Sequence, residues 1–215
     1  MTKFAPLNLT PANLLDYTPD WTGDRAADGR HLLPLPRFST DAPASPLPRR
    51  GAFCGDGYHH QYEDGWLATT GQSACRAALT AMYMPRRPEM RTVMEAKGAE
   101  LGCIGDQISW PIDIAVPGDV YIADVYGKID QSAVIGDNLA TSISIYAKSG
   151  NGIVHDAAVL TSTAFRSYRL HQLCAQLPPH LCVADDYVNR RQHPIRIGKA
   201  TVMPEILVLG RARMA

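Results

Sequence analysis

The sequence has no excess of charge of either sign, because 21 Lys and Arg residues balance 21 Asp and Glu residues over 215 positions. Binding to nucleic acid phosphates relies on clustered basic charge, so we expect no nucleic acid partner. The chain also has no apolar run of the roughly 20 residues that a membrane helix needs. Residues 1–6 do not follow the charged-then-apolar pattern of a secretory signal. We therefore expect a cytoplasmic protein without a membrane partner.

Closely paired cysteines are also missing. The five cysteines, at 54, 75, 103, 174 and 182, include no CxxC pair, so neither a zinc site nor a disulfide framework is indicated. No P-loop, GxGxxG or GxSxG motif is present, which leaves nucleotide-binding and serine-hydrolase functions without support. The remaining composition is that of an ordinary globular protein, with 46% hydrophobic and 20% charged residues.

Two regions of the chain differ in composition. Residues 1–56 form a polar lead and a proline-rich stretch, which is typical of an arm and a linker. Within the lead, Thr10 and Pro11 predict a short helix over 11–15 with Thr10 as its N-cap. Residues 57–215 carry the regular patterns, and we expect them to form one α/β domain.

Strand and helix patterns alternate after residue 77. Short apolar runs predict strands over 77–84, 120–126, 152–155, 195–197 and 206–209. Pro88 and Gly102 delimit a predicted helix over 88–101. Gly136 opens a second helix, in which apolar positions 139, 143, 146 and 147 lie on one face. This alternation favours an α/β fold with layered sheets and flanking helices.

The sharpest local signal is the run Gly136, Asp137, Asn138 and Leu139 at the predicted helix start. The first amides of a helix have no intrahelical partner and lie at the positive end of its dipole, so they can bind a carboxylate or a phosphate. Simple helix capping by Asp137 or Asn138 is the alternative and requires no ligand.

Other polar residues also have structural interpretations, and for each of them the structural interpretation is the favoured one. His155 and Asp156 follow a predicted strand, where sites often lie in α/β folds, yet such residues can be structural. Asp119 suits a turn cap, and Asp124 inside a strand suits a buried hydrogen-bonding group. Two further pairs could bind a metal or an anion, or could simply be solvated: His59–His60 and Arg86–Arg87.

Three motifs in order resemble the RraA-like family: Pro117–Asp124, Gly136–Ala140 and Gly152–Asp156. That family includes 4-hydroxy-4-methyl-2-oxoglutarate aldolases, oxaloacetate decarboxylases and regulators of ribonuclease E. The resemblance implies a swivelling β/β/α domain, assembled as a homotrimer. It also implies that Mg²⁺ or Mn²⁺ and an arginine hold a small 2-oxo acid, whose carboxylate meets the amides of Gly136, Asp137, Asn138 and Leu139.

The resemblance breaks at the family's next motif, which reads roughly D-G-x-x-R-D. Asp156 is kept, but Leu160 stands at the arginine position and Thr161 at the metal-binding aspartate position. Leucine donates no hydrogen bond, and threonine is a poor Mg²⁺ ligand. His155, Asp156 and Arg166 are the polar groups that could contribute instead.

The resemblance therefore predicts an impaired metal-dependent lyase, which cleaves a short 2-oxo acid by retro-aldol reaction or decarboxylation to give pyruvate. Two alternatives stay open. The chain could be a non-catalytic binding or regulatory protein on the same scaffold. It could also be a damaged family member, because residues 33–56 and 157–193 depart from the family in blocks, as compensating frameshifts would produce.

Overall fold

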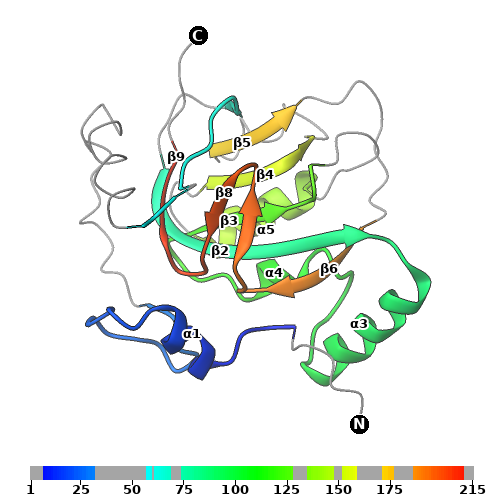
Figure 1. Cartoon of the computed structure of the whole chain (residues 1–215). Helices are drawn as coiled ribbons and strands as arrows, with labels where there is room; N and C mark the ends of the chain where they lie inside the picture. Colours follow the sequence, from blue (N-terminus) through cyan, green and yellow to red (C-terminus); the bar gives the residue numbers. More distant parts are fainter. Residues whose placement is uncertain are drawn as a thin grey trace.

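A computed structural model of the chain describes residues 7–31, 57–59, 61–68, 74–127, 135–147, 152–158, 171–176 and 186–210. These residues form a seven-stranded sheet in the order β1-β5-β4-β3-β2-β6, with β9 also paired to β2 (Figure 1). Two further strands form a separate two-stranded sheet. The strands are β1 (Leu67–Ala68), β2 (Ala74–Pro85), β3 (Asp119–Asp124), β4 (Gly152–Ala158), β5 (His171–Gln176), β6 (Asp186–Arg191), β7 (Ile195–Ile197), β8 (Ala200–Val202) and β9 (Leu207–Gly210).

The centre of the sheet is parallel. Strands β2, β3, β4 and β5 run in the same direction, whereas β6 and β9 pair antiparallel with β2 and β1 pairs antiparallel with β5. Because the carboxyl ends of parallel strands meet at one edge, the last residues of β3 and of β4 lie at the same edge of the sheet.

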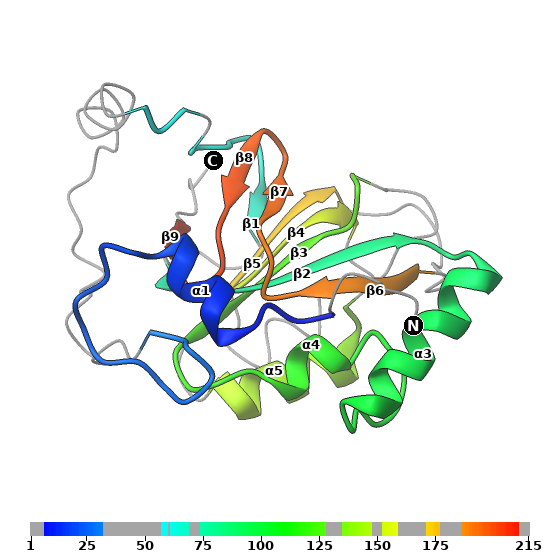
Figure 2. The ribbon, with the colours of Figure 1, turned by 60° about the horizontal axis from the view of Figure 1, so that its bottom comes forward.

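The molecule has three layers, which Figure 2 shows from the side: the β7–β8 hairpin, the large sheet, and the helices. The hairpin packs on one sheet face through Ile195 and Ile197, which meet Val120 and Ile122. The opposite face carries the main core, to which the helices contribute. Those helices are α3 (Pro88–Glu100), α4 (Trp110–Asp113) and α5 (Asp137–Ala147).

Burial of both faces explains the sequence of β3, in which all six residues are buried. Successive side chains of a strand point to opposite faces. Val120 and Ile122 therefore join the hairpin cluster, while Tyr121 and Ala123 join the helix-covered core. A continuous apolar run of this kind is what a central parallel strand requires.

The layered α/β class predicted from the sequence is confirmed, as are most of the predicted elements. Helix α1 (Pro11–Tyr17) begins after Thr10, whose Oγ1 accepts a hydrogen bond from the Asn13 amide at 3.2 Å. Helix α3 begins at Pro88, and Gly102 follows its end with φ +72°. Among the described residues, no helix combines the length and hydropathy needed to span a membrane.

The face predicted for α5 is wrong at one position. Ala140 and Ile143 are buried and Leu139 packs against them in the core, but Tyr146 is 47% exposed. The buried stripe of α5 is therefore narrower than the apolar spacing indicates at Tyr146, while the side chain of Ala147 lies outside the described residues.

Candidate functional site

The predicted binding residues lie where the parallel strands end. Asp124 closes β3, Asp156 lies in β4, and the chain that follows β3 leads into the start of α5. This edge of an α/β sheet is where ligands commonly bind, because the chain changes direction there and exposes backbone amides.

The start of α5 has the geometry predicted for an anion site. The Gly136 carbonyl already accepts the first helical hydrogen bond, from the Ala140 amide at 3.0 Å. The amides of residues 137–139 then have no partner within the helix. No described residue accepts a hydrogen bond from the Asn138 or Leu139 amide, and Asn138 is exposed. Ile135, which is buried, fixes the chain just before this turn.

Both carboxylate oxygens of Asp156 accept hydrogen bonds from the backbone that follows β3. Its Oδ1 accepts a hydrogen bond from the Val125 amide at 2.6 Å, and its Oδ2 accepts one from the Gly127 amide at 2.9 Å. Asp124 Oδ1 accepts from the Tyr126 amide between them, also at 2.9 Å. Three successive amides are thus held by two buried carboxylates.

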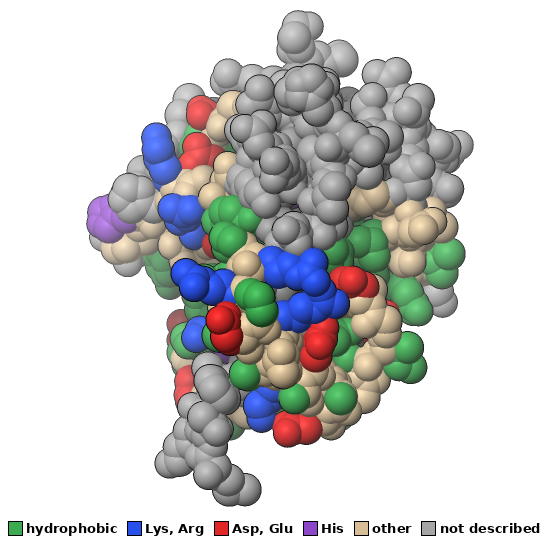
Figure 3. All heavy atoms as spheres, turned by 90° about the vertical axis from the view of Figure 1, so that its right-hand side faces the viewer, with side chains coloured by type: hydrophobic (Ala, Val, Ile, Leu, Met, Phe, Trp, Pro, Cys, Tyr) green, Lys and Arg blue, Asp and Glu red, His purple; other side chains and the backbone are tan. Residues whose placement is uncertain are grey.

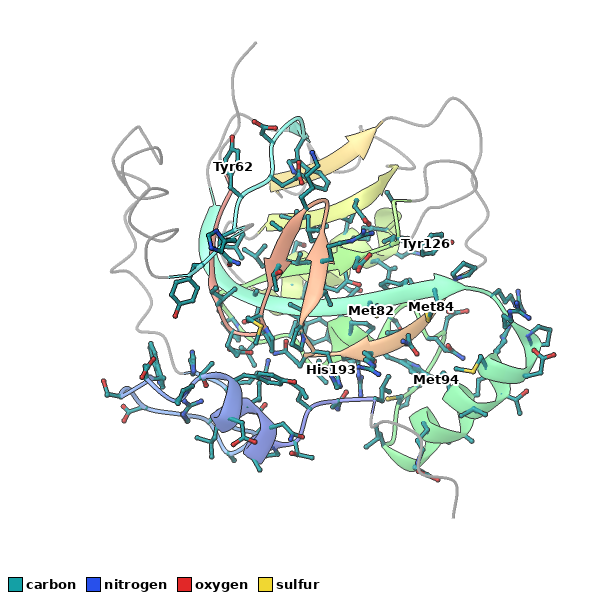
Figure 4. The ribbon with its side chains drawn as sticks, in the orientation of Figure 1. Tyr62, Met82, Met84, Met94, Tyr126 and His193 are labelled. Carbon is teal, nitrogen blue, oxygen red and sulfur yellow. The ribbon has the colours of Figure 1, made fainter. Side chains whose placement is uncertain are left out.

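This arrangement, which we call the aspartate clamp (Asp124 and Asp156 on residues 125–127), fixes an unusual turn after β3. Tyr126, labelled in Figure 4, has φ +48°, and Gly127 has φ +68°. A left-handed backbone is unfavourable for a tyrosine, so the turn persists because the clamp holds it. The Asp124 prediction of a buried hydrogen-bonding group is confirmed by the Tyr126 contact.

Burial dominates the electrostatics of the clamp. It raises the pKa of Asp156, and the neighbouring Asp124 charge adds to the rise, while the hydrogen bonds from Val125 and Gly127 oppose it. Each oxygen of Asp156 is already engaged by an amide. Asp156 therefore positions the backbone of residues 125–127.

His155 lies inside the sheet and is 1% exposed. Burial lowers its pKa to about 4, against a smaller opposing effect of the Ala157 backbone, so the ring is neutral at physiological pH. The described contacts of His155 are internal, and the structure does not bring it to the surface at the start of α5.

Several predicted site residues lie outside the described residues: Leu160, Thr161, Arg166 and His60. Their roles stay predictions. Within the part of the chain that the structure describes, no group of three His, Cys, Asp or Glu side chains is placed to hold a metal ion.

The other candidates are resolved as structural or exposed. Asp119 Oδ2 accepts a hydrogen bond from the Val116 amide at 2.9 Å, which confirms the predicted turn cap. Arg86 and Arg87 are exposed just before α3. Figure 3 shows the side of the molecule that carries α3, where basic side chains gather with acidic ones beside them. The sequence did not reveal the role of Asp156 in the aspartate clamp, because its partners are the Val125 and Gly127 amides about 30 residues away.

Comparison with known proteins shows similarity in structure alone. No protein-family model matches the sequence, and no curated protein matches it either. Among solved structures, RraAS2 from Streptomyces coelicolor, described as an unusual member of the RNase ES inhibitor RraA protein family, is 21% identical. It aligns over 82% of this chain and 83% of its own, with a TM-score of 0.59.

Two further structures share the fold. A structure described as one of novel cellulases from gut-associated microbes is 12% identical, with a TM-score of 0.62 over 93% of this chain and 83% of its own. A protein of Geobacillus kaustophilus, described as a dimethylmenaquinone methyltransferase, is 14% identical, with a TM-score of 0.51 over 76% of this chain and 89% of its own.

These likenesses confirm the predicted RraA-like fold. The three descriptions name three different activities on one scaffold, so the fold does not by itself assign an activity to this chain. The function has to be argued from its own residues.

Proposed function

We propose that this chain binds the carboxylate of a short 2-oxo acid at the start of α5, as an RraA-like protein whose lyase activity is impaired. The observation that supports binding is the helix start itself: the amides of Asn138 and Leu139 have no described acceptor, and Asn138 is exposed. A carboxylate there would accept these hydrogen bonds and meet the positive end of the helix dipole.

The impairment rests on the residues that lyase chemistry would need. The family resemblance assigns the arginine and metal-ligand positions to Leu160 and Thr161. The nearby acid, Asp156, has each carboxylate oxygen engaged by a backbone amide. The described residues therefore do not fit the Mg²⁺ or Mn²⁺ that the resemblance implies, and the proposal includes no step through a metal. Loss of one transition-state donor commonly lowers a rate by roughly 10²–10³.

Two measurements on the full chain test this proposal. Oxalate, a dicarboxylate that resembles the enolate of pyruvate, should bind in isothermal titration calorimetry. Pyruvate release from oxaloacetate, with Mg²⁺ or Mn²⁺ added, should stay close to the rate of the free metal. Rapid protein-dependent release would contradict the impairment, and absence of oxalate binding would contradict the binding function.

A matched pair of variants locates the ligand. Asn138→Glu places a negative charge at the helix start, which repels a bound carboxylate but favours the helix dipole by about 0.3–1 kcal/mol. Asn138→Gln has nearly the same shape without the charge. We expect oxalate binding to be lost in Asn138→Glu and kept in Asn138→Gln, with neither protein destabilised. Equal binding by both variants would place the ligand elsewhere.

A regulatory protein on the same scaffold is the second candidate. It is favoured by the structural similarity to RraAS2, whose description refers to an RNase ES inhibitor family. The zero net charge suits a protein partner better than RNA. Stable co-purification of a defined protein partner with the chain, without pyruvate release, would support this candidate.

The homotrimer implied by the resemblance is part of the first proposal. Sedimentation equilibrium of the purified chain measures it directly. A monomer at micromolar concentration would remove the trimer from the proposal and leave the binding site to be tested on its own.

A further inference from the structure

The β7–β8 hairpin is fastened to the rest of the molecule at few points. Among the described strands, β7 and β8 pair with each other and with no strand of the large sheet. We call residues 194–204, which contain both strands and their turns, the hairpin segment. Its inner face is apolar, since Ile195, Ile197 and Val202 lie in one cluster with Val120 and Ile122 of β3. Apolar contact is not directional, so the hairpin segment can move away from the sheet without breaking a backbone ladder.

The hydrogen bonds that join this region to the sheet lie at the base of the hairpin segment. The Gln192 amide donates to the Thr80 carbonyl at 2.9 Å, and the Glu205 amide donates to the Ala78 carbonyl at 3.0 Å. Thr80 Oγ1 donates to the His193 carbonyl at 2.7 Å, and the Gln192 side chain donates to the Glu205 carboxylate. The residues just before and just after the hairpin segment are therefore bound to β2 and to each other.

These two flanking residues also share an unusual backbone conformation. Gln192 has φ +52° and Glu205 has φ +65°. The left-handed region is unfavourable for residues other than glycine, so a change in their backbone angles relieves strain and offsets part of the cost of lifting the hairpin segment. Hinges are commonly a few residues at the ends of elements that absorb such changes. Gln192 and Glu205 have the position and the conformation of a hinge pair.

The tip of the hairpin segment is held by Glu63. Its Oε2 accepts a hydrogen bond from the Lys199 amide, in the turn between β7 and β8. Within the part of the chain that the structure describes, this is the one hydrogen bond that links residues 194–204 to anything beyond the adjoining turn. Figure 2 shows the cyan segment 61–66 passing beside this tip.

Gly198, next to Lys199, allows the carboxylate to reach this amide. A Cβ atom at position 198 would lie 2.5 Å from Glu63 Oε2 and 2.6 Å from Glu63 Cγ. Gly198 also has φ +56°, a conformation that other residues adopt only with strain. The contact thus has two matched parts, an acceptor on residues 61–66 and a glycine in the turn that it meets.

We propose that the hairpin segment is a latched flap. Glu63 holds its tip closed, and when this contact breaks the flap lifts about Gln192 and Glu205 and uncovers the apolar face formed by Val120 and Ile122. This inference does not depend on the proposed function, because the flap covers the sheet face opposite α5. A two-stranded hairpin on its own is at best marginally stable in water, so the lifted flap also loses the protection of its own amides.

Amide hydrogen exchange of the full chain, followed by NMR, measures the lifting. Glu63→Ala removes the acceptor, and we expect amides of residues 195–202 to exchange about tenfold faster than in the unmodified chain, the effect of one partly exposed charge-assisted hydrogen bond. Amides of β3 should not change, and the Gln192 and Glu205 amides should stay protected because the hinge stays bound to β2. Unchanged exchange at residues 195–202, or an equal acceleration in β3, would overturn the proposal.

A second variant breaks the same contact from the other side. Gly198→Ala should also accelerate exchange at residues 195–202, because its methyl group displaces the Glu63 carboxylate. The double variant should exchange more slowly than the product of the two single effects predicts, and fully multiplicative effects would show that Glu63 and Gly198 do not act as one latch. Asp64→Asn, at an exposed position of the same segment, is the matched control and should behave as the unmodified chain.

Thiol labelling distinguishes a lifted flap from a frayed turn. Val202 is 8% exposed on the inner face of the flap, whereas Ala123 is fully buried on the opposite face of β3. With peptide-resolved mass spectrometry, Val202→Cys should be labelled about tenfold faster when combined with Glu63→Ala, and Ala123→Cys should be labelled at an unchanged rate. Faster exchange without faster labelling at position 202 would mean that the turn frays while the flap stays closed, and would refute the flap.

Discussion

Replacing Asp156 with asparagine tests the aspartate clamp directly. The substitution preserves shape but turns one acceptor oxygen into an NH₂ group, which then faces the amide of either Val125 or Gly127. One charge-assisted hydrogen bond is lost, either at the buried Val125 amide or at the amide of Gly127, which is exposed and can bond to water instead. The loss costs about 2 kcal/mol. For a protein of this size, about 2 kcal/mol corresponds to a fall in Tm of roughly 6 °C.

Differential scanning calorimetry at neutral pH measures the effect. Asp16→Asn, at an exposed position on α1, is the control and should shift Tm by less than about 1 °C. Because the clamp also holds Tyr126 in its left-handed conformation, amide exchange at residues 125–127 should rise in Asp156→Asn. A Tm change of under about 2 °C would show that the turn does not depend on the carboxylate and would refute the reasoning.

Three further predictions concern stability. Burial raises the folded pKa of Glu205 to about 7, so the ionisation of Glu205 lowers the unfolding free energy as pH rises through that value, by on the order of 3 kcal/mol. In urea unfolding, Glu205→Gln should therefore match the unmodified chain at about pH 4.5. At about pH 8 it should be more stable than the unmodified chain by that order. An equal effect at both pH values would contradict this. Gly98→Ala brings a methyl group within 2.1 Å of the Trp110 ring. Although alanine has the better helix propensity, this overlap should lower the unfolding free energy by about 2 kcal/mol. An unchanged urea midpoint would disprove the close approach of α3 to Trp110. Tyr83→Phe removes one partner of the buried 2.7 Å contact with the Tyr121 hydroxyl and should cost about 1–3 kcal/mol by thermal unfolding, whereas the exposed Tyr146→Phe should cost almost nothing.

The sequence allowed prediction of elements whose signals are local. Thr10 with Pro11 and Pro88 with Gly102 mark helix ends by chemistry that acts within one turn, and the structure has helices there. The continuous apolar runs at 120–126 and 152–155 predict central strands, since a strand covered on both faces needs apolar side chains on both. The structure covers both faces of the sheet there.

The elements that were not predicted depend on distant partners. β6 reads Asp-Tyr-Val-Asn-Arg-Arg, which has no strand pattern, yet it pairs antiparallel with β2 and its Arg191 is buried through bonds to Asn8 and to the Trp110 carbonyl. Such a strand is specified by its neighbours and not by its own composition.

The candidate site divides in the same way. The amides at the start of α5 could be predicted, because any helix of this sequence exposes them. The role of Asp156 could not, since a carboxylate beside a strand end reads equally as a ligand or as a backbone acceptor. Only the positions of the Val125 and Gly127 amides separate the two.

The pairing of β2 has a consequence for synthesis on the ribosome. Its first half pairs with β9 and its second half with β6, so the same edge of one strand is completed by two segments from the end of the chain. β9 is synthesised about 125 residues after β2, which at roughly 5–20 residues per second is a delay on the order of 10 s. During that interval this edge of the nascent β2 exposes unpaired amides and carbonyls, which can pair with a strand of another chain.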